Sequence, residues 1–182
     1  MPLEGETIRL RAVERSDAAR AYAWINDREV TEHLAVRYPL SFATEEEWVA
    51  RAAQQNGYGD AVFAIEIADG GEHIGNCGLH NVSPEDRVAE LGVMIGAKEH
   101  WGRGYGADAV RTLCRFGFEE LDLHRIELTT ADYNVRAQRY YERVGFVVEA
   151  RKREHRYKAG RYHDSVIMVL LRSDFEAREA QR

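Results

Sequence analysis

The sequence is poor in cysteine and proline, and it has no long hydrophobic run. Its 182 residues include 2 cysteines and 3 prolines. Because Cys77 and Cys114 can form at most one disulfide, a disulfide-stabilised secreted scaffold is disfavoured and a reduced, cytoplasmic protein is expected. The longest apolar run, residues 166–171, is far too short to span a bilayer. Residues 1–6 also lack the basic and apolar segments of a signal peptide.

An excess of basic residues is absent too. Acidic residues outnumber basic ones by 31 to 25, and the formal net charge is −6. Nucleic acid is therefore not expected as a partner, because its binding needs a basic surface. The hydrophobic fraction of 45% is typical of a globular chain. The length suits one domain, residues 1–182, since no repeat or linker divides the sequence.

Hydrophobic periodicity predicts an α+β protein with a mixed sheet of about seven strands and about four helices. The order of elements is β-α-α-β-β-β-α-β-α-β-β. Strands are predicted at residues 7–13, 61–68, 73–80, 88–95, 125–131, 146–157 and 162–171. The third helix is the most strongly patterned, with an apolar stripe formed by Val110, Leu113, Cys114, Gly117, Phe118 and Leu121.

Several local signals set the expected boundaries. Ser16 is predicted to cap the first helix, and Thr44 to open the second with a capping box completed by Glu47. The second helix is expected to end near Asn56 and Gly57. Gly92 lies inside a predicted strand, where glycine is typical of a β-bulge.

The segment Trp101-Gly102-Arg103-Gly104-Tyr105-Gly106 lies between a predicted strand and the third helix. Glycines at alternate positions leave backbone N–H groups uncovered at a helix N-terminus, where the helix dipole favours anions. The pattern therefore predicts a site for a pyrophosphate. A tight turn without a ligand is one alternative. A dinucleotide fingerprint, completed by Ala107 and Glu127, is another, but the flanking hairpins are not those of a doubly wound fold.

A second group of polar residues belongs to the fourth predicted helix. Asn134 is suited to cap this helix, and Tyr141 lies two turns further along the same face. Together they could present an amide and a phenol to one elongated ligand. The alternative is that Tyr140 and Tyr141 simply pack in the core.

These two segments, in this order, resemble the GNAT superfamily of acetyl-CoA-dependent N-acetyltransferases. The resemblance covers residues 8–175. It is strongest to the branch of ribosomal-protein N-terminal (alanine/serine) acetyltransferases and spermidine acetyltransferases, on account of Ala89-Glu90-Leu91-Gly92 and the ending at residues 145–171. Trp101 departs from the Gln or Arg that many members carry. The resemblance implies a sheet splayed in its middle, acetyl-CoA as acetyl donor and no metal.

It also implies roles for individual residues. The backbone of Val93, Met94 and Ile95 would pair with the pantetheine arm, and Asn134 would bond to it. The pyrophosphate would be held by the segment of Trp101, Gly102, Arg103, Gly104, Tyr105 and Gly106. Tyr141 would protonate the departing thiolate, and Glu90 would take the proton of the attacking amine, with Glu127 and Asp132 as further candidates. The alternative for Glu90 is an ordinary carboxylate on a strand face.

The acceptor expected from the resemblance is a primary amine, most simply a protein N-terminal α-amine of the ribosomal-protein type. A polyamine such as spermidine, or another small amine, is the alternative, and a non-catalytic acyl-CoA-binding module is a second one. The acceptor would enter between residues 28–42 and the terminal hairpin. Homodimers are common among proteins of this resemblance, so a homodimer is a further expectation.

Overall fold

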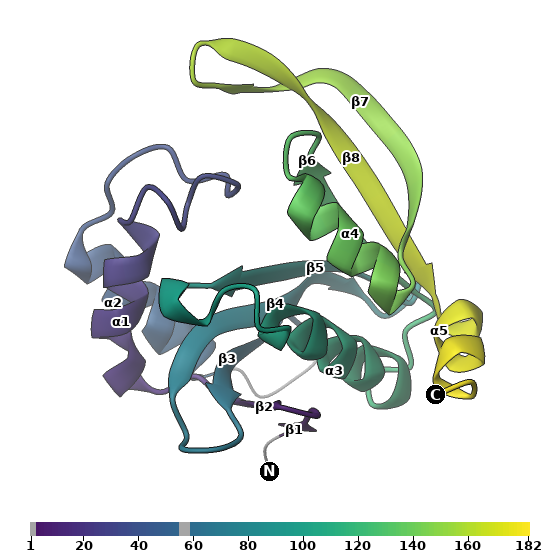
Figure 1. Cartoon of the computed structure of the whole chain (residues 1–182). Coiled ribbons are helices and arrows are strands. Elements are labelled where there is room, and N and C mark those ends of the chain that lie inside the picture. Colours follow the sequence, from purple (N-terminus) through teal and green to yellow (C-terminus); the bar gives the residue numbers. More distant parts are fainter. Residues whose placement is uncertain (1–2, 55–58) are drawn as a thin grey trace.

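The computed structural model describes residues 3–54 and 59–182 and contains one sheet with helices on both faces (Figure 1). The sheet has 8 strands in the order β1-β2-β3-β4-β5-β6-β8-β7. Their bounds are β1 Leu3–Glu4, β2 Ile8–Ala12, β3 Ala61–Ile67, β4 His73–Ser83, β5 Val88–Ile95, β6 Arg125–Ala131, β7 Val147–Lys158 and β8 Arg161–Leu171. The predicted α+β fold with a mixed sheet is confirmed, and short β1 is an addition to it.

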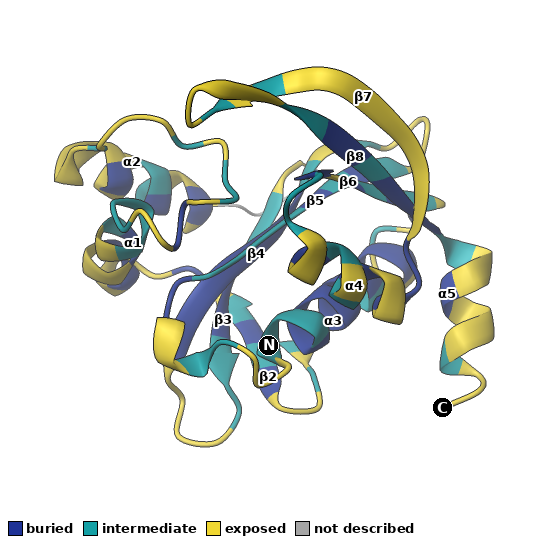
Figure 2. Cartoon of the chain, turned by 45° about the horizontal axis from the view of Figure 1, so that its top comes forward, coloured by how far each residue is buried: buried dark blue, intermediate teal, exposed yellow. Residues whose placement is uncertain are grey.

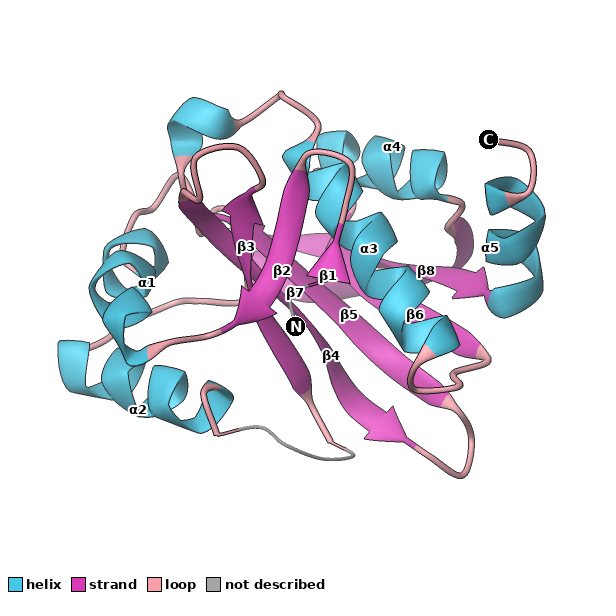
Figure 3. Cartoon of the chain, turned by 90° about the horizontal axis from the view of Figure 1, so that it is seen from below, coloured by secondary structure: helices cyan, strands magenta, loops and turns pink. Residues whose placement is uncertain are grey.

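The helices form two groups on opposite faces of the sheet (Figure 3). Their bounds are α1 Ala18–Ile25, α2 Phe42–Ala52, α3 Tyr105–Glu119, α4 Val135–Val144 and α5 Arg172–Glu179. Helices α1 and α2 pack against Ala64 of β3, whereas α3 and α4 pack on the other face against residues such as Leu79 and Ile126. Helix α5 follows the last strand and was not predicted. No helix among the described residues is both long and apolar enough to cross a membrane.

The strand pairing decides whether the glycine loop belongs to a mixed α+β sheet or to a doubly wound, dinucleotide-binding fold. Strand β5 pairs with β6 in parallel, and the other strand pairs are antiparallel. A doubly wound fold needs repeated parallel crossovers, so the dinucleotide alternative is wrong. The β5–β6 pairing covers only residues 88–90 and 125–127. Beyond Glu90 the two strands separate, and one edge of β5 is left open. The predicted splay is therefore present.

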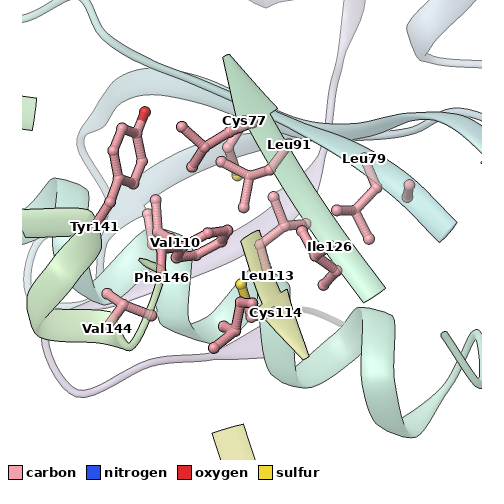
Figure 4. Packing of buried hydrophobic residues seen from close by; sticks show 14 of the residues in the cluster. Cys77, Leu79, Leu91, Val110, Leu113, Cys114, Ile126, Tyr141, Val144 and Phe146 are labelled. Atoms are coloured by element: carbon pink, nitrogen blue, oxygen red, sulfur yellow. The ribbon is translucent and has the colours of Figure 1, made fainter. Parts of the chain in front are cut away.

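The third helix carries most of the core on its face of the sheet (Figure 4). Val110, Leu113, Cys114 and Phe118 are buried, as the apolar stripe predicted. They pack among strand residues such as Leu79, Leu91 and Ile126, and Tyr141 and Phe146 close the cluster from α4 and the turn after it. Burying each of these large side chains stabilises the fold by roughly 2 kcal/mol.

The last two strands form a long hairpin that projects away from the body of the sheet (Figures 1 and 2). Strand β7 is at the edge of the sheet and is exposed along most of its length. At the tip, the rings of Tyr157 and Tyr162 pack edge to face across the two strands, with centroids 5.1 Å apart. Figure 1 shows the tip arching over α4 toward the segment between α1 and α2.

Two of the predicted helix caps are wrong. A 3-10 turn over Arg15–Asp17 precedes α1, so Ser16 lies inside this turn and Asp17 is the residue before α1. The Asp17 carboxylate accepts the backbone N–H of Glu14 at 2.9 Å, and this contact sets the chain direction instead. Helix α2 begins at Phe42 with Ser41 as its cap, because the Ser41 hydroxyl accepts the Thr44 N–H at 3.1 Å. Thr44 is thus inside the first turn.

Two further expectations also need correction or limits. Gly92 makes no bulge, since the β4–β5 register is continuous from Gly75–Ile95 to His80–Glu90 and shifts only between His80 and Ser83. The expected end of the second helix, at Asn56 and Gly57, lies outside the described residues. The helix itself ends at Ala52.

Candidate active site

The glycine segment forms a loop whose N–H groups are free to bind a ligand. Gly102 and Gly104 have positive φ angles of 81° and 90°, which side-chain-bearing residues rarely adopt. Gly104 precedes α3 and supplies no side-chain cap. Within the described part of the chain, no hydrogen bond uses the N–H of residues 102–106 as donor. Five backbone donors at the positive end of a 15-residue helix suit an anionic group such as a pyrophosphate.

A groove rich in arginine begins at this loop. Its volume is about 490 Å³, and α3, α4, α5 and the start of β2 line it. Arg103, Arg111, Arg143, Arg178 and Arg182 contribute to its walls. Arg111 and Arg182 both pair with Glu6, at 2.8 and 2.7 Å, and Arg111 also pairs with Asp108 at 3.4 Å. The groove therefore continues the positive potential of the loop mainly through the remaining arginines, of which Arg103 is the one nearest in sequence to the glycines.

Trp101 and Arg136 flank the same loop. The Trp101 indole donates a hydrogen bond to the Ile95 carbonyl at 2.9 Å. The Arg136 guanidinium lies over the indole ring, 5.8 Å from its centroid. Arg136 was not singled out from the sequence. It is an exposed residue at the start of α4, and only the packing of α4 beside the loop brings its charge to the anion site.

The open edge of β5 offers fewer backbone groups than the resemblance implied. Backbone groups of alternate residues point to opposite edges of a strand. The Arg87 carbonyl faces β6, where it accepts the His124 N–H. Alternation therefore directs Val93 and Ile95 to the open edge and Met94 to β4. Since Trp101 already occupies the Ile95 carbonyl, the Val93 backbone groups and the Ile95 N–H are what this edge presents.

Asn134 and Tyr141 occupy the positions that the sequence suggested. The Asn134 side-chain oxygen accepts the Ala137 N–H at 3.3 Å, so Asn134 caps α4 and keeps its amide N–H group for another partner. Tyr141 is 7% exposed and joins the core. Figure 4 shows its hydroxyl directed away from Val110 and Phe146. Burial raises the pKa of Tyr141 to about 12, and the hydrogen bond with Tyr140 opposes this shift only in part. The phenol therefore keeps its proton at neutral pH.

Glu90 lies on the other face of the sheet, at the last residue where β5 and β6 are paired. It is directly opposite His80 on β4 and Glu127 on β6. The Asn81 side-chain amide donates to Glu90 Oε2 at 3.2 Å. No ion pair to Glu90 is present among the described residues. An unpaired carboxylate beside the splay can accept a proton directly or through a water molecule.

The two other carboxylates considered as bases are engaged differently. Glu127 forms an ion pair with Arg125 at 2.9 Å, and Arg125 also holds Glu149. Asp132 lies 3.5 Å from the ring of His163, which packs edge to face on Tyr133. Glu127 has a cationic partner and Asp132 has a histidine neighbour, whereas Glu90 accepts, among the described residues, only the neutral amide of Asn81, so Glu90 remains the better placed of the three.

The hairpin tip contacts the segment between α1 and α2 above the splay. The Lys158 ammonium donates to the Thr31 carbonyl at 3.0 Å and also to the Glu32 carbonyl. The His33 ring packs beside Tyr133, with centroids 5.5 Å apart. Burial lowers the pKa of His33 and of Lys158; neighbouring cations reinforce both shifts, and the Glu32 carboxylate opposes both. Those cations include Arg37, Arg136 and Arg156. We name Arg37, Arg156 and Lys158 the cationic mouth. The sequence pattern gave no sign that these residues lie near one another.

One group of side chains outside the splay could hold a metal ion. Glu72, Glu99 and His100 each place a ligand atom within 4.8 Å of the other two. The ring of His100 lies 3.0 Å from Glu72, and both carboxylates are exposed. An ordinary surface ion pair explains this contact.

Comparison with known proteins identifies the family and the fold. Residues 7–147 match the family model of the acetyltransferase (GNAT) domain. The "Putative ribosomal N-acetyltransferase YdaF" of Bacillus subtilis is 34% identical, with 94% of each chain covered. The spermidine N(1)-acetyltransferase of Vibrio cholerae is 31% identical over 91% of this chain and 94% of that protein. A crystal structure of the Vibrio cholerae spermidine N-acetyltransferase with CoA and spermine superimposes with a TM-score of 0.85, at 30% identity, covering 93% of this chain and 98% of that one.

Proposed function

The chain belongs to the GNAT family of N-acetyltransferases, and we propose that it transfers the acetyl group of acetyl-CoA directly to the N-terminal α-amine of a protein. The relationship to a ribosomal-type acetyltransferase supports this acceptor, and the cationic mouth is the observation that carries it. A polyamine bears several positive charges, which Arg37, Arg156 and Lys158 would repel. An α-amine of pKa about 7.8 carries a single positive charge when protonated, and it loses this charge close to neutral pH.

The energetics of the amine favour the same acceptor. Holding an α-amine neutral at pH 7 costs about 1 kcal/mol, whereas an alkyl amine near pKa 10.4 costs about 4.6 kcal/mol. Within the described residues, Glu90 is a single carboxylate without an ion-pair partner beside the splay. A carboxylate in this position is sufficient to accept one proton from an α-amine. The second candidate acceptor is spermidine, which the similarity to the spermidine N-acetyltransferase structure favours.

The chain's own residues divide the work of the transfer. The N–H groups of residues 102–106, with Arg103 and Arg136, would hold the pyrophosphate, and the open edge at Val93 would align the pantetheine arm. Glu90 would draw the proton from the attacking amine. Tyr141 would donate a hydrogen bond to the departing sulfur. Because a thiol has a pKa of about 8.5, complete proton transfer from a phenol of pKa about 12 is uphill, so stabilisation of the thiolate is its main effect.

Release of free thiol from acetyl-CoA tests the acceptor. The panel is a set of short peptides with free N-termini, the same peptides with blocked N-termini, and spermidine. We expect turnover on the free peptides, none on the blocked ones, and a kcat/KM for spermidine at least roughly tenfold lower. A preference for spermidine would overturn the protein acceptor in favour of the polyamine, and failure of every amine in the presence of bound acetyl-CoA would contradict both.

A further inference from the structure

We propose that His80, oriented by Asp60, is a second acceptor, beside Glu90, for the proton of the attacking amine, which it takes through its Nε2 atom. Neither the sequence motifs nor the family resemblance pointed to His80. The inference rests on direct transfer to an amine as proposed above. It deepens that mechanism by naming a second proton acceptor on the same face of the sheet.

The orientation of the ring comes from Asp60. His80 Nδ1 lies 3.2 Å from Asp60 Oδ2, and the other oxygen of this carboxylate accepts the Asn81 N–H at 2.9 Å. Because a carboxylate accepts hydrogen bonds, Nδ1 carries the proton in the neutral ring. The lone pair is then on Nε2, which is the form that a general base needs. Asp60 is itself fixed by the backbone of Asn81, so the pair is oriented before any substrate binds.

Two glycines let the ring lie flat over the sheet toward the splay. A Cβ atom placed on Gly78 would be 3.1 Å from His80 Nε2, and one placed on Gly92 would be 3.4 Å from it. Gly78 and Gly92 are directly paired across β4 and β5. Nε2 therefore reaches from β4 to β5, over a residue two positions beyond Glu90, where β6 has already separated.

The side chains around the His80 ring are those of Asp60, Glu90 and Asn81. Glu90 is the cross-strand neighbour of His80, and the side chain of Asn81 binds Glu90 while its backbone binds Asp60. An imidazolium at His80 would thus lie between two carboxylates, Asp60 and Glu90. Glu127 is in the same row but is already paired with Arg125.

The amine nitrogen forms a bond to the thioester carbonyl carbon, and the C–S bond breaks with its electron pair on sulfur. The proton of the amine passes to His80 Nε2. Tyr141 donates a hydrogen bond to the thiolate. The imidazolium then gives its proton to water and the thiolate takes one, so the products are an amide and a free thiol.

Three variants test this role through thiol release with whichever amine the wild type acetylates. His80→Ala should lower kcat about 100-fold, as expected for loss of a general base, with the affinity for CoA unchanged. Added imidazole should restore much of the rate. Asp60→Asn should lower kcat without adding to the effect of His80→Ala in the double variant. His124→Ala is the matched control, because His124 is exposed at the start of β6, and imidazole should leave its rate unchanged.

The state of the ring can be measured without any acceptor. Nitrogen NMR of the free protein should find the His80 tautomer with the proton on Nδ1, and Asp60→Asn should reduce its population. The proposal is overturned if His80→Ala retains the wild-type rate within about twofold, if imidazole fails to rescue a folded, CoA-binding variant, or if the ring carries its proton on Nε2. If the wild type acetylates no amine, the proposed function fails, and the tautomer alone still decides whether His80 presents a free Nε2.

Discussion

The Asp108 carboxylate accepts the backbone N–H of Thr7 at 2.6 Å, which joins the first turn of α3 to the start of β2. The same side chain also accepts the Thr7 hydroxyl at 2.9 Å and the N–H groups of Glu6 and Ile8 at 3.1 and 3.2 Å. These residues are about a hundred positions apart in the chain. The carboxylate therefore fixes the N-terminal end of α3, into which the glycine loop leads. Its negative charge is also favourable at the positive end of the helix dipole.

Asp108→Asn should lower the free energy of unfolding by about 2 kcal/mol at pH 7, because hydrogen bonds to a charged acceptor are lost. Although burial raises the pKa of Asp108, the N–H groups of Thr7, Glu6 and Ile8 outweigh it and lower the pKa. The stabilisation is therefore complete above the ordinary carboxyl pKa of about 3.9 and is lost as the pH falls through the folded-state value. Urea unfolding should show that the free energies of unfolding of the wild type and Asp108→Asn differ at pH 7 and become equal at acid pH. A difference that does not change with pH would contradict this.

Comparison of Gly104→Ala with Gly106→Ala should distinguish the effect of backbone strain on stability from the effect of a methyl group on CoA binding. Gly104 has a φ of 90°, so alanine there should destabilise the protein by about 1 kcal/mol. Gly106 lies inside α3, and a Cβ there would be 3.6 Å from Ile95, an ordinary contact. Gly106→Ala should thus leave the unfolding free energy equal or higher. If the loop holds the pyrophosphate, both variants should bind CoA at least roughly tenfold more weakly, as calorimetry can measure. Unchanged affinity in Gly106→Ala would argue against the loop as the binding site.

Tyr141→Phe should lower kcat by roughly 10- to 100-fold, because a hydrogen bond to a developing thiolate is lost. The affinity for CoA should be spared, since the phenyl ring still packs with Phe146. Burial holds the pKa of Tyr141 at about 12, so the phenol should support catalysis without loss up to about pH 10. The matched control is Tyr140→Phe, the adjacent phenol of the pair. Equal losses in the two variants would indicate a packing effect.

Glu90→Gln should lower kcat more than tenfold while sparing the affinity for CoA, because the unpaired carboxylate at the splay is neutralised. Glu127→Gln is the control, since Glu127 is already balanced by Arg125 at the neighbouring strand position. Its kcat should change by no more than about threefold. Steady-state kinetics at saturating acetyl-CoA distinguish the two, and a larger loss in Glu127→Gln would reverse the assignment.

Local sequence signals located an element correctly where only one residue or face could fulfil the role. They misplaced it where two nearby residues could fulfil the same role. The stripe on α3 and the cap at Asn134 were predicted because a single helical face and a single amide satisfied them. The cap of α2 was misplaced because Ser41 and Thr44 are both cap-forming residues three positions apart. Gly92 was misinterpreted because a glycine inside a regular strand pair has the same local pattern as one at a bulge.

Apart from β1 and α5, the sequence by itself determined the order of strands and helices along the chain, the glycine loop before α3 and the pair of Asn134 and Tyr141, since these depend on contacts within a few residues. Only the tertiary structure decided which charges meet at the site. Arg136 reaches the loop through the packing of α4, Lys158 reaches Glu32 across 126 positions, and Asp60 orients His80 across 20. Such contacts join residues whose spacing carries no periodic signal, so they exist only once the sheet has brought their strands together.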